Sequence, residues 1–149
     1  MRRELPGGYE LDDDPARIDV HAVHTYIAGE SYWGRGRTLA LTERAIAGSS
    51  RVVGLYHQGR QVGFARAVSD GAIVAYLADV YVLREHRGRG LGLELVRETV
   101  DGQPGAPAAN VRWLLHTADA QGLYAKLGFG VDLPAYPLME RARGYDSSP

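Results

Sequence analysis

Apolar and polar residues alternate with a period of two through the middle of the chain, between about residues 51 and 83. This period is typical of strands that bury one face. Two turn sequences, Gln58-Gly59-Arg60 and Ser69-Asp70-Gly71, divide the stretch into three parts. Strands joined by such short turns pair as antiparallel hairpins, so the pattern predicts a meander. The expected strands are 52–57, 61–68 and 73–83.

Before the meander, apolar residues recur every three or four positions, which predicts helices. Asp14 can cap a helix that has Pro15 at its first position, and Thr38 can cap a second helix that Gly48 closes. The expected elements of this region are a frayed segment at 1–8, a short strand at 9–11 and helices at 15–27 and 39–47.

After the meander, helical and strand-like patterns alternate. A helix is expected from Leu91, because apolar side chains recur at Leu95 and Val100. The later elements expected are a strand at 111–116, a short helix at 118–127 and an extended segment at 129–139. This order indicates an α+β fold, with a mixed, mostly antiparallel central sheet flanked by helices. We expect one domain over residues 1–149, with frayed ends at about 1–8 and 142–149.

The composition narrows the function classes. Of the 149 residues, 45% are apolar and 23% are charged, as in a soluble globular domain, and the formal net charge is −1. Nucleic acids and anionic membranes attract proteins with a basic surplus, so neither is expected as a partner. The absence of cysteine excludes a disulfide framework, a cysteine nucleophile and a thiolate metal site. No apolar run reaches about 18 residues, so no membrane span is expected and the cytoplasm is the default location.

The segment from Arg84 to Gly92 joins the last meander strand to the next helix and is dense in arginine and glycine. A helix start leaves backbone N–H groups without partners and carries partial positive charge, and glycines let an anion approach the backbone. The segment is therefore a candidate phosphate site. A dinucleotide fingerprint would need glycine where Leu93 stands, and the glycine-lysine pair of a Walker loop is absent.

A better match is Arg87-x-x-Gly90-x-Gly92, which resembles the acyl-CoA-binding signature of the GNAT superfamily of N-acetyltransferases. Further on, the run from Leu123 to Phe129 resembles the late Leu-Tyr-x-Lys-x-Gly-Phe element of that family. The resemblance covers roughly residues 50–130, and the N-terminal helices match the variable acceptor region of the family in outline. It implies the GNAT fold, acetyl-CoA as co-substrate and no metal.

The resemblance assigns most cofactor contacts to the backbone. The pyrophosphate of coenzyme A is expected on N–H groups of the glycine loop, with added charge from Arg87 and Arg89. The pantetheine arm is expected along the strand that carries Val82, which should splay from the strand at 111–116. Thr117 stands where relatives commonly have an asparagine that contacts the cofactor. The expected cofactor-binding residues are Tyr81, Val82, Leu83, Arg87, Gly88, Arg89, Gly90, Leu91, Gly92, Thr117 and Tyr124.

The resemblance also implies the catalytic groups. The Val82 N–H would polarise the thioester carbonyl, as an oxyanion hole does. Tyr124 matches the tyrosine that the family often uses to protonate the leaving thiolate. The pKa of a thiol is about 8.5 and that of a phenol about 10, so a phenol can donate to the thiolate if it is placed at the sulfur. Asp79 is the first candidate for the base that deprotonates the amine, and Glu30 is the second. Without a cysteine, direct transfer in a ternary complex is expected.

The loop between the first two helices contains candidates for the acceptor pocket. Tyr32 and Trp33 can form an aromatic wall with Tyr26 below them, and aromatic faces with a carboxylate such as Glu30 suit a cationic amine. The alternative is that these aromatics form a hydrophobic plug between the helices and the sheet.

Two function classes stay open from the sequence. The first is an acetyl-CoA-dependent N-acetyltransferase that acts on a primary amine of a small molecule or peptide. The second is a non-catalytic, regulatory acyl-CoA-binding module of the same fold, in which Tyr124 and Asp79 have only structural roles. A different nucleotide ligand is a third alternative. Many relatives dimerise, so a homodimer is an expected assembly.

Overall fold

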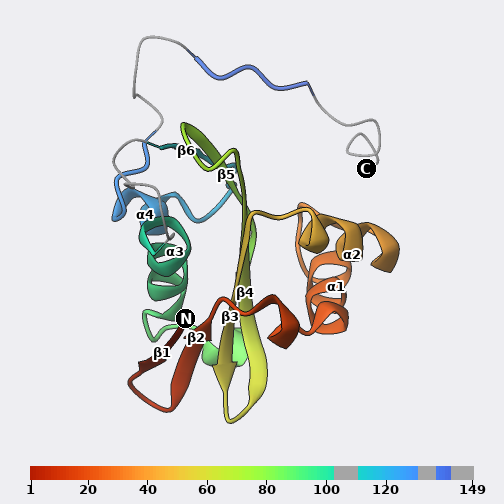
Figure 1. The fold of residues 1–149 in the computed structure, drawn as a ribbon, viewed down its shortest axis with the longest axis vertical. Coiled ribbons are helices and arrows are strands. Elements are labelled where there is room, and N and C mark those ends of the chain that lie inside the picture. Colours follow the sequence, from red (N-terminus) through yellow and green to blue (C-terminus); the bar gives the residue numbers. More distant parts are fainter. Residues whose placement is uncertain (103–110, 131–136, 142–149) are drawn as a thin grey trace.

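The computed structural model describes residues 1–102, 111–130 and 137–141 (Figure 1). Within these residues, six strands form one sheet in the order β1-β2-β3-β4-β5-β6. Neighbours from β1 to β5 are antiparallel, and β6 runs parallel to β5. The strands are β1 (Arg2–Leu5), β2 (Tyr9–Asp12), β3 (Arg51–His57), β4 (Arg60–Ser69), β5 (Val74–Val82) and β6 (Arg112–Leu114). The helices are α1 (Val20–Gly29), α2 (Leu39–Ala47), α3 (Leu91–Asp101) and α4 (Gln121–Ala125), with 3-10 turns η1 (Pro15–Arg17) and η2 (Arg84–His86).

Helices cover both faces of the sheet, with α1 and α2 on one face and α3 and α4 on the other (Figure 1). On the first face, Val23 and Ile27 of α1 pack in one buried cluster with Phe64 and Tyr81 of the sheet. On the second face, Leu95 of α3 packs with buried residues of β2, β3 and β4. The predicted fold class, a mixed and mostly antiparallel sheet flanked by helices, is confirmed.

Local capping signals explain where the first helices begin. Thr38 caps α2 and Gly48 closes it, as predicted. The prediction of one helix at 15–27 was wrong, because the chain has two caps in this region. Asp14 caps only the short turn η1, and Asp19 then caps α1. Each aspartate side chain accepts a backbone N–H a few residues ahead, so each starts its own element.

The N-terminal residues form a hairpin rather than the frayed segment expected at 1–8. β1 pairs antiparallel with β2, and Leu5 packs against the core. β1 has four residues, of which none is fully buried, so its sequence carries little hydrophobic pattern. Pairing with β2, rather than propensity, therefore places this strand.

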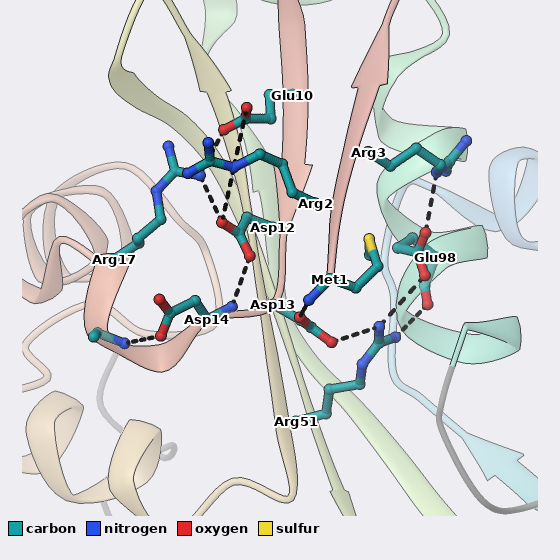
Figure 2. A network of polar contacts seen from close by, with 11 residues as sticks. Met1, Arg2, Arg3, Glu10, Asp12, Asp13, Asp14, Arg17, Arg51 and Glu98 are labelled. Atoms are coloured by element: carbon teal, nitrogen blue, oxygen red, sulfur yellow. Dashed lines mark hydrogen bonds and ion pairs between the residues drawn. The ribbon is translucent and has the colours of Figure 1, made fainter.

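An ion network fastens the hairpin to the rest of the fold (Figure 2). Arg17 contacts Asp12 at 2.6 Å. Arg51 of β3 contacts Asp13 at 3.2 Å and Glu98 of α3 at 3.4 Å. The acidic run at the end of β2 is therefore a set of ion-pair partners as well as a helix cap.

β6 pairs with β5 over three residues only, from Val74 to Tyr76. From Leu77 to Val82, the outer edge of β5 has no strand partner in the part of the chain that the structure describes. The two strands separate there, as predicted, although β6 is shorter than the strand expected at 111–116. This open edge leads directly into η2 and α3.

The C-terminal elements are shorter than predicted. The helix expected at 118–127 is limited to α4. Of the extended segment expected at 129–139, residues 131–136 lie outside the described residues, as does the frayed end expected at 142–149. Among the helices that are described, none is long and apolar enough to cross a membrane.

Candidate active site

The chain passes from η2 into α3 through Gly88 and Gly90. Both glycines have a left-handed backbone, with φ of +79° and +77°. A Cβ at either position would meet no atom of the described chain within 4 Å. Gly90 is the N-cap of α3 and provides no side-chain hydrogen bond, so the first-turn N–H groups lack an intrahelical partner. The loop is an open, uncapped helix start, which is suited to bind an anion.

The next two residues, Leu91 and Gly92, also pack against neighbouring elements. Leu91 is buried in the core beneath the loop. Gly92 faces α4, where a Cβ would come within 3.2 Å of Leu123 Cδ1. A side chain at Gly92 would therefore press against α4, while the backbone N–H groups of both residues stay in the first turn of α3.

The two arginines of the loop differ in their contacts. Arg87 donates through Nε to the Val82 carbonyl at 2.8 Å and through Nη2 to the Tyr26 hydroxyl at 2.9 Å. Tyr26 is buried and stacks on Tyr81, with ring centroids 4.0 Å apart. Arg87 thus connects the loop to β5 and α1 through hydrogen bonds. Arg89 is exposed and has no partner among the described residues.

The backbone of β5 has a donor on its open edge. The Leu83 N–H donates to the Val62 carbonyl at 2.8 Å, so these residues form a hydrogen-bonded pair of the β4–β5 ladder. Pairs of an antiparallel ladder alternate, so the next pair, Val82 and Gly63, is of the non-hydrogen-bonded kind. The Val82 N–H therefore points toward the edge that β6 leaves uncovered.

Tyr124 lies on α4 and packs against a cluster that includes Leu77, at the start of the open edge of β5. Its ring meets Phe129 edge-on, with centroids 5.9 Å apart. Burial, with smaller effects of Tyr32 and Asp119, raises the pKa of Tyr124 to about 12. Its hydroxyl makes no hydrogen bond within the described residues. The phenol is therefore neutral near pH 7.

Tyr32 links the loop between α1 and α2 to the turn that precedes α4. Its side chain is half exposed, and its ring packs edge-on against Trp33 with centroids 5.0 Å apart. Its hydroxyl accepts the Ala118 N–H at 2.7 Å. The adjacent Thr117 accepts the N–H of the α4 N-cap residue at 3.0 Å and shapes the same turn. The α1–α2 loop thus meets the β6–α4 loop near the start of α4.

Asp79 lies where the register between β4 and β5 shifts, with a left-handed backbone (φ +53°) and a buried side chain. Its carboxylate accepts hydrogen bonds from Trp33 Nε1 at 2.9 Å, Arg37 Nη1 at 2.7 Å and Arg66 Nε at 2.8 Å. Burial alone would raise the pKa of Asp79, but the hydrogen bonds and charges of the two arginines outweigh it and lower that pKa.

Sequence reasoning placed Asp79 and Trp33 at the site but missed Arg37 and Arg66. Arg66 is a charged residue in an otherwise apolar strand pattern, which is a signal that could have been used. Arg37 follows a long loop, where no local pattern predicts its contacts. Glu30 is exposed at the C-cap of α1 and contacts none of these side chains in the described structure.

Two of the histidines, His24 and His116, make polar contacts with neighbouring residues. His24 Nε2 lies 2.9 Å from the Arg37 carbonyl oxygen, and His116 Nδ1 lies 2.5 Å from the Tyr76 hydroxyl. Within residues 1–102, 111–130 and 137–141, no group of three or more histidine, aspartate or glutamate side chains could hold a metal ion.

Comparisons with known proteins define the class of this site. A family model described as acetyltransferase (GNAT) domain matches residues 48–131. A curated protein from Gibberella zeae, described as a predicted acetyltransferase, is 30% identical in an alignment 141 positions long that covers 80% of this chain and 77% of that protein. The crystal structure of a predicted GNAT-family acetyltransferase from Xanthomonas campestris pv. campestris is 38% identical, with a TM-score of 0.83, and covers 97% of this chain and 100% of its own.

A more distant structure has the same fold. Glucosamine-6-phosphate N-acetyltransferase from Arabidopsis thaliana superposes with a TM-score of 0.62 at 11% identity, covering 93% of this chain and 99% of its own. A mixed sheet with helices on both faces is the fold that this chain shares with these acetyltransferases. The chain belongs to the GNAT acetyltransferase family.

Proposed function

We propose that this protein transfers the acetyl group of acetyl-CoA to a primary amine by direct attack in a ternary complex. The observation that carries the proposal is the open edge of β5, which leads into the uncapped start of α3 and begins beside Tyr124. Such an edge offers backbone donors to an extended ligand, and the helix start offers donors to its phosphates. A neutral phenol beside the start of that edge can provide a proton.

The glycine loop fits the pyrophosphate of coenzyme A. The space beside Gly88 and Gly90 is open, and the uncapped first turn of α3 directs N–H donors and positive potential to it. Arg89 is exposed and without a partner in the described residues, so it can pair with a phosphate oxygen. When bound, acetyl-CoA supplies an acetyl group already activated as a thioester.

Two groups of the chain act on the reacting atoms. The Val82 N–H, on the uncovered edge of β5, donates to the carbonyl oxygen and stabilises the negative charge that develops there. Tyr124 gives its hydroxyl proton to the departing sulfur. Because burial raises the pKa of Tyr124 to about 12, the phenol carries its proton near pH 7, and the phenolate left after the transfer, which is a stronger base than the thiolate, regains a proton from water.

Asp79 has a positioning role in this proposal rather than the role of base. Its carboxylate already accepts three hydrogen bonds, and the arginines, against the effect of burial, lower its pKa and make it a weak proton acceptor. It orients Trp33, which with Tyr32 forms the aromatic wall of the acceptor side. Glu30, exposed at the end of α1, is the proposed proton acceptor for the amine, directly or through water.

Acetyl-CoA turnover with a panel of primary amines, followed as release of free thiol, tests the proposal. We expect thiol release that depends on the amine, and an apparent unfolding temperature raised by acetyl-CoA but not by NAD or ATP. If acetyl-CoA binds tightly and no amine gives thiol release, the protein is a regulatory acyl-CoA-binding module instead. If NAD or ATP stabilises it and acetyl-CoA does not, the ligand assignment is wrong.

A further inference from the structure

Two guanidinium groups share one carboxylate on the face of the sheet that α1 and α2 cover. Arg37 comes from the α1–α2 loop, Arg66 from β4 and Asp79 from β5. Arg37 Nη1 and Arg66 Nε lie 2.7 Å and 2.8 Å from the same atom, Asp79 Oδ2. The three side chains are 9%, 14% and 4% exposed. Two positive charges and one negative charge leave this cluster with a positive surplus.

The cluster has donors to spare. A guanidinium carries five N–H donors, and each arginine uses one nitrogen to reach Asp79. Neither side chain has a further partner among the described residues. The buried polar atoms that lack a partner there belong to other residues, so the unused nitrogens of Arg37 and Arg66 are not sealed from solvent. They are available to a ligand.

Contacts between side chains link the arginine cluster to the proposed site of acetyl transfer. Trp33 donates to Asp79 Oδ1, and its ring packs against that of Tyr32. Tyr32 accepts the backbone N–H of Ala118, in the turn that leads to α4 and Tyr124. A continuous line of contacts thus runs from the arginines to the proposed proton donor.

We propose that the acceptor amine also carries an anionic oxygen group, a carboxylate or a phosphate, which the unused donors of Arg37 and Arg66 bind. The inference rests on the proposed function, because it names the class of amine that the same site acetylates. Guanidinium groups bind both kinds of oxyanion through paired N–H donors. The low exposure of the two side chains strengthens such an interaction, because water screens it less.

The alternative is that both arginines serve only to hold Asp79. One guanidinium is enough to pair with a carboxylate through two parallel hydrogen bonds. Here neither arginine makes that bidentate pair, and both converge on one oxygen atom. Burying a second cation carries a desolvation cost that the single carboxylate does not offset. An anionic ligand supplies the missing charge, so the cluster favours an amine that carries an anionic group over an amine without one.

Matched amines test the inference. β-Alanine is compared with β-alanine amide, and O-phosphoethanolamine with ethanolamine, so that each pair differs in the anionic group. Binding is measured by calorimetry on the CoA-loaded protein, and turnover by thiol release with saturating acetyl-CoA. The variants are Arg66→Gln, which removes the charge, and Arg66→Lys, which keeps it. Arg35→Gln is the control, since Arg35 is an exposed arginine of the same loop without a partner in the described chain.

We expect the anionic member of at least one pair to bind about tenfold more tightly than its neutral partner, as loss of a charged hydrogen-bonded contact implies. Arg66→Gln should abolish that preference, so that the two members of the pair bind this variant with equal affinity. Arg66→Lys should keep part of it, and Arg35→Gln should keep all of it. The two pairs show whether the anion is a carboxylate or a phosphate.

Equal affinity for both members of both pairs, or a preference that Arg66→Gln leaves intact, would overturn the inference. If Arg66→Gln does not fold, the comparison of matched amines on the wild-type protein decides alone. If neutral and anionic amines are acetylated equally well, the proposed function is supported and the inference of an anionic acceptor is wrong. Arg66-dependent binding of an anionic amine without acetyl transfer would instead overturn the proposed function.

Discussion

At the scale of single residues, Asp79 joins a strained backbone to a buried ion cluster. A left-handed backbone costs a non-glycine residue about 1–2 kcal/mol, and aspartate is among the residues that tolerate it best. The shift in strand register beside Asp79 changes the face of the sheet toward which the following side chains point. Leu77 and Val80, three positions apart, both pack toward α3, and Tyr81 packs toward α1. The residue that gathers the arginines therefore also sets the direction of the Val82 N–H.

Asp79→Asn should lower the free energy of unfolding by about 3 kcal/mol at pH 7, because two buried guanidinium groups lose their counter-charge. Burial opposes the charge, but the arginines lower the pKa of Asp79 in the folded protein. Its stabilisation is then full above the unfolded-state pKa of about 3.9 and is lost as the pH falls through the lower folded-state pKa. Urea unfolding of wild type and variant at several pH values should show a difference that shrinks below about pH 4.

Glu43→Gln is the control for this series, because Glu43 is exposed on α2 and has no partner among the described residues. It should stay within about 0.5 kcal/mol of the wild type at pH 7. A pH-independent effect of Asp79→Asn, or one below about 1 kcal/mol at pH 7, would contradict the buried ion cluster.

Tyr124→Phe should lower kcat by about 100-fold or more, because the departing sulfur loses its proton donor. The Kd for acetyl-CoA should stay near the wild-type value, since the ring is kept. Tyr56→Phe is a matched control: burial raises the pKa of Tyr56 to about 12 as well, but its hydroxyl donates to the Arg17 carbonyl, away from α4. Thiol-release kinetics and calorimetry on both variants provide the test, and equal kcat for them would remove Tyr124 from the mechanism.

At the scale of elements, the start of α3 depends on Gly90. The structure offers an internal reference for it in Gly59, in the β3–β4 turn. Both glycines have φ of +77°, and a Cβ on either would meet no atom of the described chain within 4 Å. Their surroundings differ, because Gly90 begins an uncapped helix and Gly59 closes a hairpin. Alanine at the two sites therefore separates backbone strain from ligand binding.

Gly90→Ala and Gly59→Ala should each destabilise the fold by about 1 kcal/mol, because both force a side chain into the left-handed region. Only Gly90→Ala should weaken acetyl-CoA binding, by about tenfold, since its Cβ enters the space proposed for the pyrophosphate and strains the donors around it. Thermal unfolding and calorimetry measure the two effects. Similar Kd values for acetyl-CoA in both variants would contradict the assignment of this loop.

Elements with local signals were predictable from the sequence. Thr38 and Gly48 bracket α2, and the turn residues between the meander strands set β3, β4 and β5 to within one or two positions. The family resemblance added the splay of β5 and the role expected of the glycine loop. The helix bounds and the meander strands depend on residues that are close together in the chain, where caps, turns and the hydrophobic period act directly.

Features that depend on distant partners were not predictable. β1 exists because β2 pairs with it, and the partners of Asp79 come from a loop 42 residues earlier and from a neighbouring strand. The expectation that a carboxylate near the middle of β5 would act as a base did not include the charges around it. A pKa depends on those charges, and a single sequence does not give their positions.

At the scale of the whole molecule, the hairpin of β1 and β2 is tied to α3 through Arg51 (Figure 2). The Arg51 side chain is 6% exposed and bridges Asp13 and the Glu98 side chain. It also donates to the backbone carbonyls of Glu98 and Thr99, in the last turns of α3. A cation at that end complements the helix dipole, so one side chain joins the hairpin, the central sheet and the helix whose other end forms the glycine loop.

Arg51→Met should lower the free energy of unfolding by about 3 kcal/mol, because buried carboxylates and helix carbonyls lose a shared donor while the apolar stem is kept. For a chain of this size, the unfolding temperature should fall by roughly 6–12 °C. Arg44→Met on α2 is the control, since Arg44 is exposed and its side chain has no partner in the described chain, and it should change stability by less than about 0.5 kcal/mol. Urea and thermal unfolding of the two variants test this link, and an unfolding midpoint for Arg51→Met equal to that of the control would show that Arg51 does not hold the hairpin to α3 (Figure 2).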